Sequence, residues 1–173
     1  KNYADYLDAI KHFNVPGQNM LFASKSGDIA LWQQADFPLR WKDQGLFVMP
    51  GDDSTYLWNG FIPQADNPHV LNPVEGYVGS ANQRPTDSTY PYFIPGNYEV
   101  YRGIILNRRL AALDQATPED MMKLQNDNYN VFAEYARPLL MKYVKPGKLD
   151  AKQKAYLDLV AKWNLYNNPE EQG

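Results

Sequence analysis

The chain contains no cysteine, which excludes thiol catalysis, cysteine-based zinc sites and disulfides. Its only histidines, His12 and His69, leave little material for histidine-based catalysis or a histidine-rich metal site. Lysine and arginine form no run or stripe and the net charge is −3, which argues against nucleic acid and anionic membranes as main partners. No apolar run approaches the roughly 18 residues that a membrane-spanning helix needs.

The residues that are abundant indicate a folded chain with many aromatic side chains. Of 173 residues, 44% are hydrophobic and 21% are charged, which is typical of a globular segment with one core. Aromatic residues make up 14%, among them 13 tyrosines and 4 tryptophans. Two interpretations stay open. These rings could pack an amphipathic core, or they could line a cleft that binds carbohydrate or peptide.

The first 96 residues are predicted to be rich in β-structure. Apolar spacing favours a helix at the start, and two short apolar runs around Gly27 favour a β-hairpin. A long stretch rich in proline and glycine follows, which we expect to be a packed loop, and then two further strands. The predicted elements lie at residues 3–10 (helix), 20–23 and 29–32 (hairpin), 36–68 (loop), and 70–71 and 76–81 (strands).

Residues 97–166 are predicted to be helical, and residues 167–173 form a polar tail that we expect to fray. Thr117 followed by Pro118 is typical of a helix start, and Asp150 with Gln153 resembles a capping box. Pro138 should kink or restart the helix that contains it. Segregation of strands and helices into two halves predicts an α+β fold.

Arg102 stands at the head of a helical stripe that continues through Leu106, Leu110 and Leu113. Its stem should therefore face the core, where a guanidinium needs an anion, an amide carbonyl or a water-filled cleft. The alternative is that the side chain reaches solvent from the start of the helix.

Asn82 ends the strand predicted at residues 76–81, in the stretch Gly-Tyr-Val-Gly-Ser-Ala-Asn-Gln-Arg-Pro. An asparagine there can be an ordinary turn residue. It can also be an amide held at the end of a strand so that it donates to a developing oxyanion, and losing such a donor costs about 10²–10³ in rate.

Several segments together resemble the penicillin acylase (penicillin amidase) family. They are the hairpin around Pro16–Ser24 and Gly27–Ala30, the stretch Trp58–Pro63, Asn72-Pro73 followed by Gly76-Tyr77-Val78 and Ala81-Asn82, the helix beginning near Arg102, and Met122–Asp127. The resemblance covers roughly residues 3–165 and corresponds to the middle of the family's β chain.

The resemblance implies an N-terminal-nucleophile hydrolase with an αββα sandwich, made as a precursor and cut into an α and a β chain. In such enzymes the first residue of the β chain, a serine, attacks an amide with its own α-amino group as the base. Asn82 falls on the family's oxyanion-hole asparagine. Arg102 falls near the arginine that positions this asparagine and the substrate.

The resemblance also implies a bound calcium ion, for which Asp43 resembles one ligand. A second ligand is expected about eleven residues beyond Asn82, but Phe93 and Ile94 stand there. The remaining ligands would lie outside this chain.

Lys1 cannot be the nucleophile, so the resemblance implies a segment that needs the α chain and the rest of the β chain as partners. We expect it to contribute an oxyanion donor and part of the acyl pocket and to be inactive alone. The expected substrate of the parent is a small N-acyl amide, and the expected location is periplasmic or secreted. The alternative is a non-catalytic module that binds sugar or peptide through its Tyr/Trp-rich loops.

Overall fold

The computed structural model describes residues 2–170 and divides the chain into two compact units, Lys1–Val100 and Tyr101–Gly173. Lys1, excluded above as a nucleophile, and the last three residues of the polar tail lie outside the described residues. No helix within residues 2–170 is both long and apolar enough to cross a membrane.

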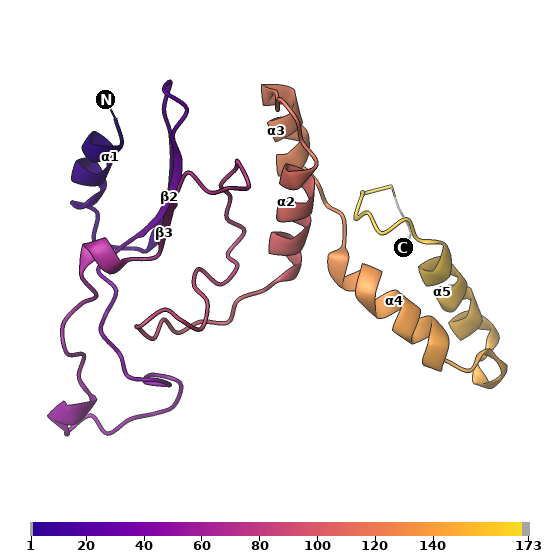
Figure 1. Ribbon diagram of the computed structural model, residues 1–173. Helices are drawn as coiled ribbons and strands as arrows, with labels where there is room; N and C mark the ends of the chain where they lie inside the picture. Colours follow the sequence, from indigo (N-terminus) through magenta and orange to yellow (C-terminus); the bar gives the residue numbers. More distant parts are fainter. Residues whose placement is uncertain (1, 171–173) are drawn as a thin grey trace. The chain divides into compact units, whose positions relative to one another are not determined.

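A small antiparallel sheet organises the first unit (Figure 1). The structure confirms the predicted helix and hairpin, with α1 at Tyr3–Ile10, β1 at Gln18–Ala23 and β2 at Ile29–Gln34. The short strand β3, His69–Leu71, pairs with the other side of β2, so that the strand order is β1-β2-β3.

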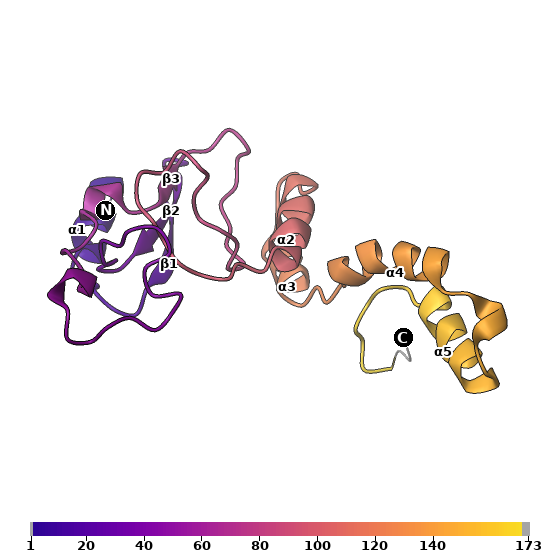
Figure 2. The ribbon, with the colours of Figure 1, turned by 90° about the horizontal axis from the view of Figure 1, so that it is seen from below.

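Helix α1 packs beside the hairpin (Figures 1 and 2). The Tyr6 hydroxyl donates to the Met20 carbonyl at 2.8 Å, and the ring of Tyr6 lies 5.1 Å from that of Phe22. Ala30 and Trp32 alternate along the central strand β2 and are buried, as the period of two predicts. These contacts fix the sheet that carries one wall of the pocket described below.

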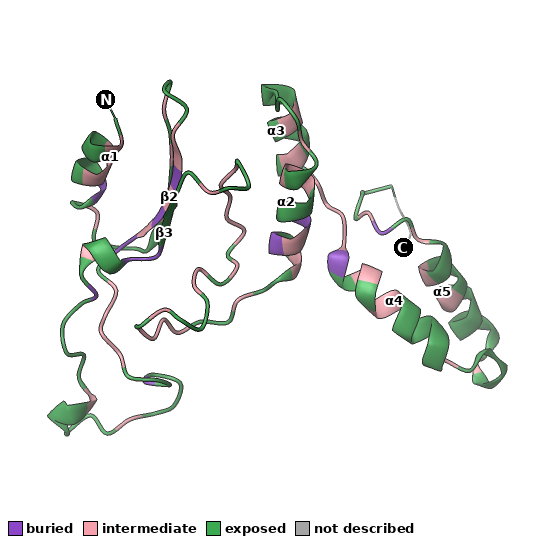
Figure 3. Cartoon of the chain, viewed as in Figure 1, coloured by how far each residue is buried: buried purple, intermediate pink, exposed green. Residues whose placement is uncertain are grey.

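The long loop at residues 36–68 is confirmed and is packed by its own polar side chains. Its only helical segments are two single 3₁₀ turns, η1 (Ser54–Tyr56) and η2 (Gln64–Asp66). Gln44 is almost fully buried and donates to the Tyr56 carbonyl at 2.9 Å, while buried Asn67 donates to the Ala35 carbonyl at 3.1 Å. Figure 3 shows such buried positions separated by long exposed stretches.

The strand predicted over residues 76–81 is wrong, because this stretch is irregular backbone with bends at Gly76 and Ala81. Gly76 has φ +75°, a left-handed conformation that interrupts an extended strand. Further along, the Gln83 side chain binds the Ala81 N–H at 2.6 Å and the Gly79 carbonyl at 3.1 Å. Those backbone groups are therefore satisfied locally rather than by a neighbouring strand.

The second unit is helical, as predicted. Thr117 and Asp150 both begin helices with complete capping boxes, and the helix containing Pro138 continues through that residue without a break. The helices are α2 (Tyr101–Ala111), α3 (Pro118–Gln125), α4 (Val131–Tyr143) and α5 (Ala151–Lys162), with the single turn η3 (Pro146–Lys148) before α5.

The leucine stripe predicted for α2 is only partly buried, since Leu106 and Leu110 are half-buried and Leu113 lies beyond the end of the helix. Arg102 is exposed, which agrees with the alternative that its side chain reaches solvent, whereas Gly103 and Ile105 are fully buried. Two side chains of α2 contact α4. The ring of Tyr101 lies 5.3 Å from that of Phe132, and Arg108 forms an ion pair with Glu134.

Candidate functional site

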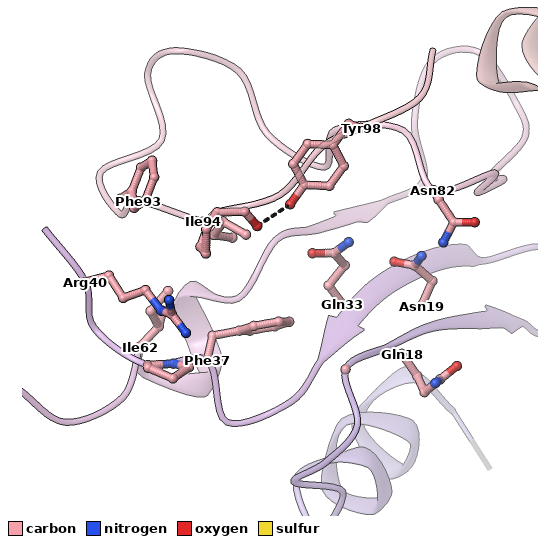
Figure 4. A pocket seen from close by; sticks show the side chains of 13 residues that line it. Gln18, Asn19, Gln33, Phe37, Arg40, Ile62, Asn82, Phe93, Ile94 and Tyr98 are labelled. Carbon is pink, nitrogen blue, oxygen red and sulfur yellow. Dashed lines mark hydrogen bonds between the residues drawn. The ribbon is translucent and has the colours of Figure 1, made fainter. Parts of the chain in front are cut away.

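A pocket of about 280 Å³ opens in the first unit, between the sheet and the segment that carries Asn82 (Figure 4). Its polar lining consists mainly of carboxamides, and its apolar lining comes from the loop after β2 and from residues 93–95. Among the described residues, this lining contains one cation, Arg40, and no acid. The lining residues are Gly17, Gln18, Asn19, Gln33, Phe37, Pro38, Arg40, Ile62, Asn82, Phe93, Ile94, Pro95 and Tyr98.

Asn82 lies in a bend with φ +60°, which asparagine tolerates better than most residues with a Cβ atom. The amide therefore sits on a turn at the edge of the pocket and not at the tip of a strand. Figure 4 shows its carboxamide close to those of Asn19 and Gln33, which come from β1 and β2. Three side chains that can each donate and accept hydrogen bonds thus gather on one side of the pocket.

Phe93, Ile94, Pro95 and Tyr98 supply another part of the pocket lining. The Tyr98 hydroxyl donates to the Pro95 carbonyl at 3.3 Å, and burial raises the pKa of Tyr98 (Figure 4). Gly96 has φ +152°, and a Cβ atom there would stand 3.0 Å from the Tyr98 ring. Glycine therefore allows the tyrosine ring to fold back on its own loop.

The chemistry of this lining is that of binding and stabilisation. Carboxamide N–H groups can donate to a carbonyl oxygen and, more strongly, to an oxyanion. The described lining contains no serine, threonine, cysteine, lysine or histidine. It therefore offers no group of the usual kinds to attack an amide.

Arg102 belongs to the second unit, as the second residue of α2, whereas Asn82 and Asp43 belong to the first. Asp43 lies in the exposed turn after Arg40, with φ +69°, and is not in the pocket lining. The three residues singled out from the sequence are therefore not gathered at one place within either unit.

The residues present do not complete a calcium site. Within residues 2–170, no group of three or more histidine, cysteine, aspartate or glutamate side chains lies close enough together to hold a metal ion. Asp43 offers a single carboxylate, although Ca²⁺ takes six to eight oxygen ligands. Phe93 and Ile94, at the place of a second ligand, are apolar and line the pocket instead.

Sequence reasoning missed the carboxamides of the sheet, Gln18, Asn19 and Gln33. The sequence could have indicated them in two ways. Gln18 and Asn19 are a polar pair at the start of a strand that continues as Met-Leu-Phe-Ala, and Gln33 lies near the end of the strand that pairs with it. Each alone reads as an exposed strand residue. Only the register, which sets Asn19 opposite Gln33, makes them one polar patch.

A second hollow, of about 510 Å³, lies in the long loop and is flanked by Trp41 and Trp58. The Arg40 guanidinium lies 5.2 Å above the Trp58 ring, within the range of a cation–π interaction. Both tryptophans are exposed, so this surface fits the alternative of a sugar- or peptide-binding module.

Known proteins resemble this chain over most of its length. It is 27% identical over 133 residues to the acyl-homoserine lactone acylase QuiP of Pseudomonas fluorescens. This match covers 77% of this chain and 16% of that protein. It is 24% identical over 151 residues to the penicillin acylase 2 proenzyme of a Pseudomonas species, covering 87% and 20% respectively. A thermostable penicillin G acylase from Alcaligenes faecalis superposes with a TM-score of 0.69 at 23% identity, over 98% of this chain and 31% of that chain.

The chain thus spans 16% to 20% of the length of these two relatives. The structural likeness confirms the α+β prediction, because the chain shares the fold of part of that penicillin G acylase. The sequence also matches the profile of the penicillin amidases over residues 1–173. The chain belongs to the penicillin amidase family.

Proposed function

We propose that this chain works as part of an N-acyl amide hydrolase and that Asn82 donates to the oxyanion of the transition state. The observation that carries the proposal is the place of the Asn82 carboxamide in the lining of a carboxamide-rich pocket, in a chain of the penicillin amidase family. The names of the relatives suggest the substrates, N-acyl homoserine lactones or penicillins.

In this proposal the parent protein supplies the nucleophile. The hydroxyl of an N-terminal serine adds to the amide carbon, and its proton passes to the α-amino group of the same residue. The carbonyl oxygen becomes an oxyanion, to which the Asn82 N–H donates. The C–N bond then breaks, the amine leaves with the proton, and water hydrolyses the acyl-enzyme.

The other expected residues keep supporting roles. Arg102 orients Asn82 or the substrate, and Asp43 contributes one carboxylate to a calcium site that the rest of the parent completes. The partners are the α chain and the remainder of the β chain, and the location is periplasmic or secreted.

Replacement of Asn82 in the full-length parent tests the proposal. We expect Asn82→Ala to lower kcat by about 10²–10³, because one oxyanion donor is lost. Asn126→Ala, at the exposed end of α3, is the control and should leave kcat unchanged. A loss of less than about tenfold in the Asn82 variant would contradict the assigned role.

The chain alone should not turn over a chromogenic phenylacetyl or fatty-acyl amide, because the described pocket lining contains no usual nucleophile. Turnover by the pure chain would refute its status as a catalytically incomplete segment. Binding of an oligosaccharide or peptide by the pure chain, lost in Trp58→Ala, would favour the binding module instead.

A further inference from the structure

The backbone around Asn82 is held by side chains rather than by a strand ladder. Residues 79–83 form irregular backbone with a bend at Ala81 and Asn82. An oxyanion donor must keep its N–H within hydrogen-bond distance of a position that is occupied only in the transition state. Whatever restrains this bend therefore restrains the donor.

The first restraint is the side chain of Gln83. Its Oε1 accepts from the Ala81 N–H at 2.6 Å, and its Nε2 donates to the Gly79 carbonyl at 3.1 Å. One carboxamide thereby closes the bend on the N-terminal side of Asn82. This bridge sets the local conformation, but it does not tie the bend to the sheet.

The second restraint makes that connection. The Asn19 Nδ2 donates to the Ser80 Oγ at 2.7 Å, across 61 positions of sequence, and both side chains are half-buried. Asn19 is in β1, whose six residues all pair with β2. Ser80 is two residues before Asn82, so this bond links the bend to the paired strand β1.

We propose that Asn19 and Ser80 are positioning residues for the reaction, because their hydrogen bond holds the Asn82 carboxamide at the distance that an oxyanion requires. The inference rests on the proposed role of Asn82. Neither residue needs to touch the reacting atoms. Small displacements of a catalytic group can cost up to about 10²-fold in rate, so we expect a loss of about tenfold when this hydrogen bond is removed.

Ser80→Ala and Asn19→Ala in the full-length parent test the inference, with rates measured per titrated active site. We expect each to lower kcat by about tenfold and to change KM by less than about threefold, since the contact is stronger to the oxyanion of the transition state than to the carbonyl oxygen of the bound substrate. Ser80→Thr keeps the hydroxyl and should retain more than about half of kcat. Ser26→Ala, in the β1–β2 turn, is the matched control and should be unchanged.

The double variant of Ser80→Ala and Asn82→Ala distinguishes a positioning role of Ser80 from a role in stabilising the fold. If Ser80 acts through Asn82, adding Ser80→Ala to Asn82→Ala should change kcat by less than about twofold. A full further tenfold loss, or an effect on KM alone, would overturn the inference. Should Asn19→Ala fail to fold, the two Ser80 variants carry the test.

The outcomes also distinguish this inference from the function on which it rests. Unchanged activity in Asn82→Ala refutes the proposed oxyanion role itself. A large loss in Asn82→Ala together with full activity in Ser80→Ala and Asn19→Ala refutes only the positioning role.

Discussion

Gly45 illustrates how single residues shape the surroundings of the pocket. It has φ +89°, and a Cβ atom there would stand 2.7 Å from the Arg40 Nη1. The Arg40 guanidinium also donates to the Gln44 carbonyl at 3.4 Å and is part of the pocket lining. A glycine at this position therefore lets the one cation of the pocket lie against its own loop.

We predict that Gly45→Ala lowers the free energy of unfolding by about 1–2 kcal/mol, because alanine disfavours a positive φ and its methyl group displaces the guanidinium. Urea denaturation measures the change. Gly51→Ala is the control, since its φ lies outside the left-handed region and nothing lies within 4 Å of its added Cβ atom. Equal effects of the two substitutions would contradict the prediction.

The ionisation of Tyr6 should make the free energy of unfolding depend on pH. Burial, followed by the nearby Tyr3, raises the pKa of Tyr6 to about 12 in the folded chain. This pKa lies above the unfolded value of about 10. The folded state therefore holds the proton more tightly, and the stabilisation is complete below pH 10 and is lost as pH rises toward 12.

Tyr6→Phe should remove this contribution, so the unfolding free energy of the variant should fall less steeply than that of the native sequence between pH 10 and pH 12. Tyr143→Phe, at an exposed ring, is the control. Identical slopes in all three proteins, measured by denaturant titration at each pH, would refute the assignment.

Helix starts are the elements that the sequence predicted best. The Asp150 side chain accepts from the Gln153 N–H at 2.8 Å, and the Gln153 side chain accepts from the Asp150 N–H at 3.0 Å. All of these atoms lie within four consecutive residues, so the pattern is visible in the sequence. The wrong strand at residues 76–81 shows the opposite case, because a strand exists only where a distant segment pairs with it.

We predict that Asp150→Ala destabilises the helical unit by about 1 kcal/mol, because α5 loses its N-cap acceptor. Asp150→Asn keeps an acceptor oxygen and should cost much less. Chemical denaturation followed by far-UV circular dichroism measures both. An alanine variant as stable as the asparagine variant would show that the capping box contributes nothing.

At the scale of the whole molecule, each unit exposes large apolar side chains. Trp41, Trp58 and Phe61 of the first unit are 46%, 55% and 53% exposed. In the second unit, α4 exposes Phe132 and Leu139. Apolar surface of this extent is typical of regions that other parts of a protein cover.

The purified chain should therefore self-associate as its concentration rises, and replacing Trp41 and Trp58 by serine should raise the monomer fraction. Lys25→Ser, at an exposed polar position, is the control. Sedimentation velocity distinguishes the species. A native chain that stays monomeric over the same concentrations as the double variant would contradict this prediction.

The sequence by itself determined the hairpin, the helix starts and the resemblance to the family. Local features predict the hairpin around Gly27 and the starts of α3 and α5. These features are turn residues, caps and periodicity, and each lies within a few positions of the sequence. Arg102 shows the limit of such reasoning, since leucine spacing allowed either a buried stem or a side chain that reaches solvent, and only the structure shows that Arg102 is exposed.

Only the tertiary structure decided which side chains share the pocket. Asn19 and Asn82 are 63 positions apart, and nothing near either residue indicates the other. They meet because β1 and β2 pair in one register and because the Asn19 amide binds Ser80. The physical reason is that local bonds depend on neighbouring residues alone, whereas a site depends on which distant surfaces bury each other.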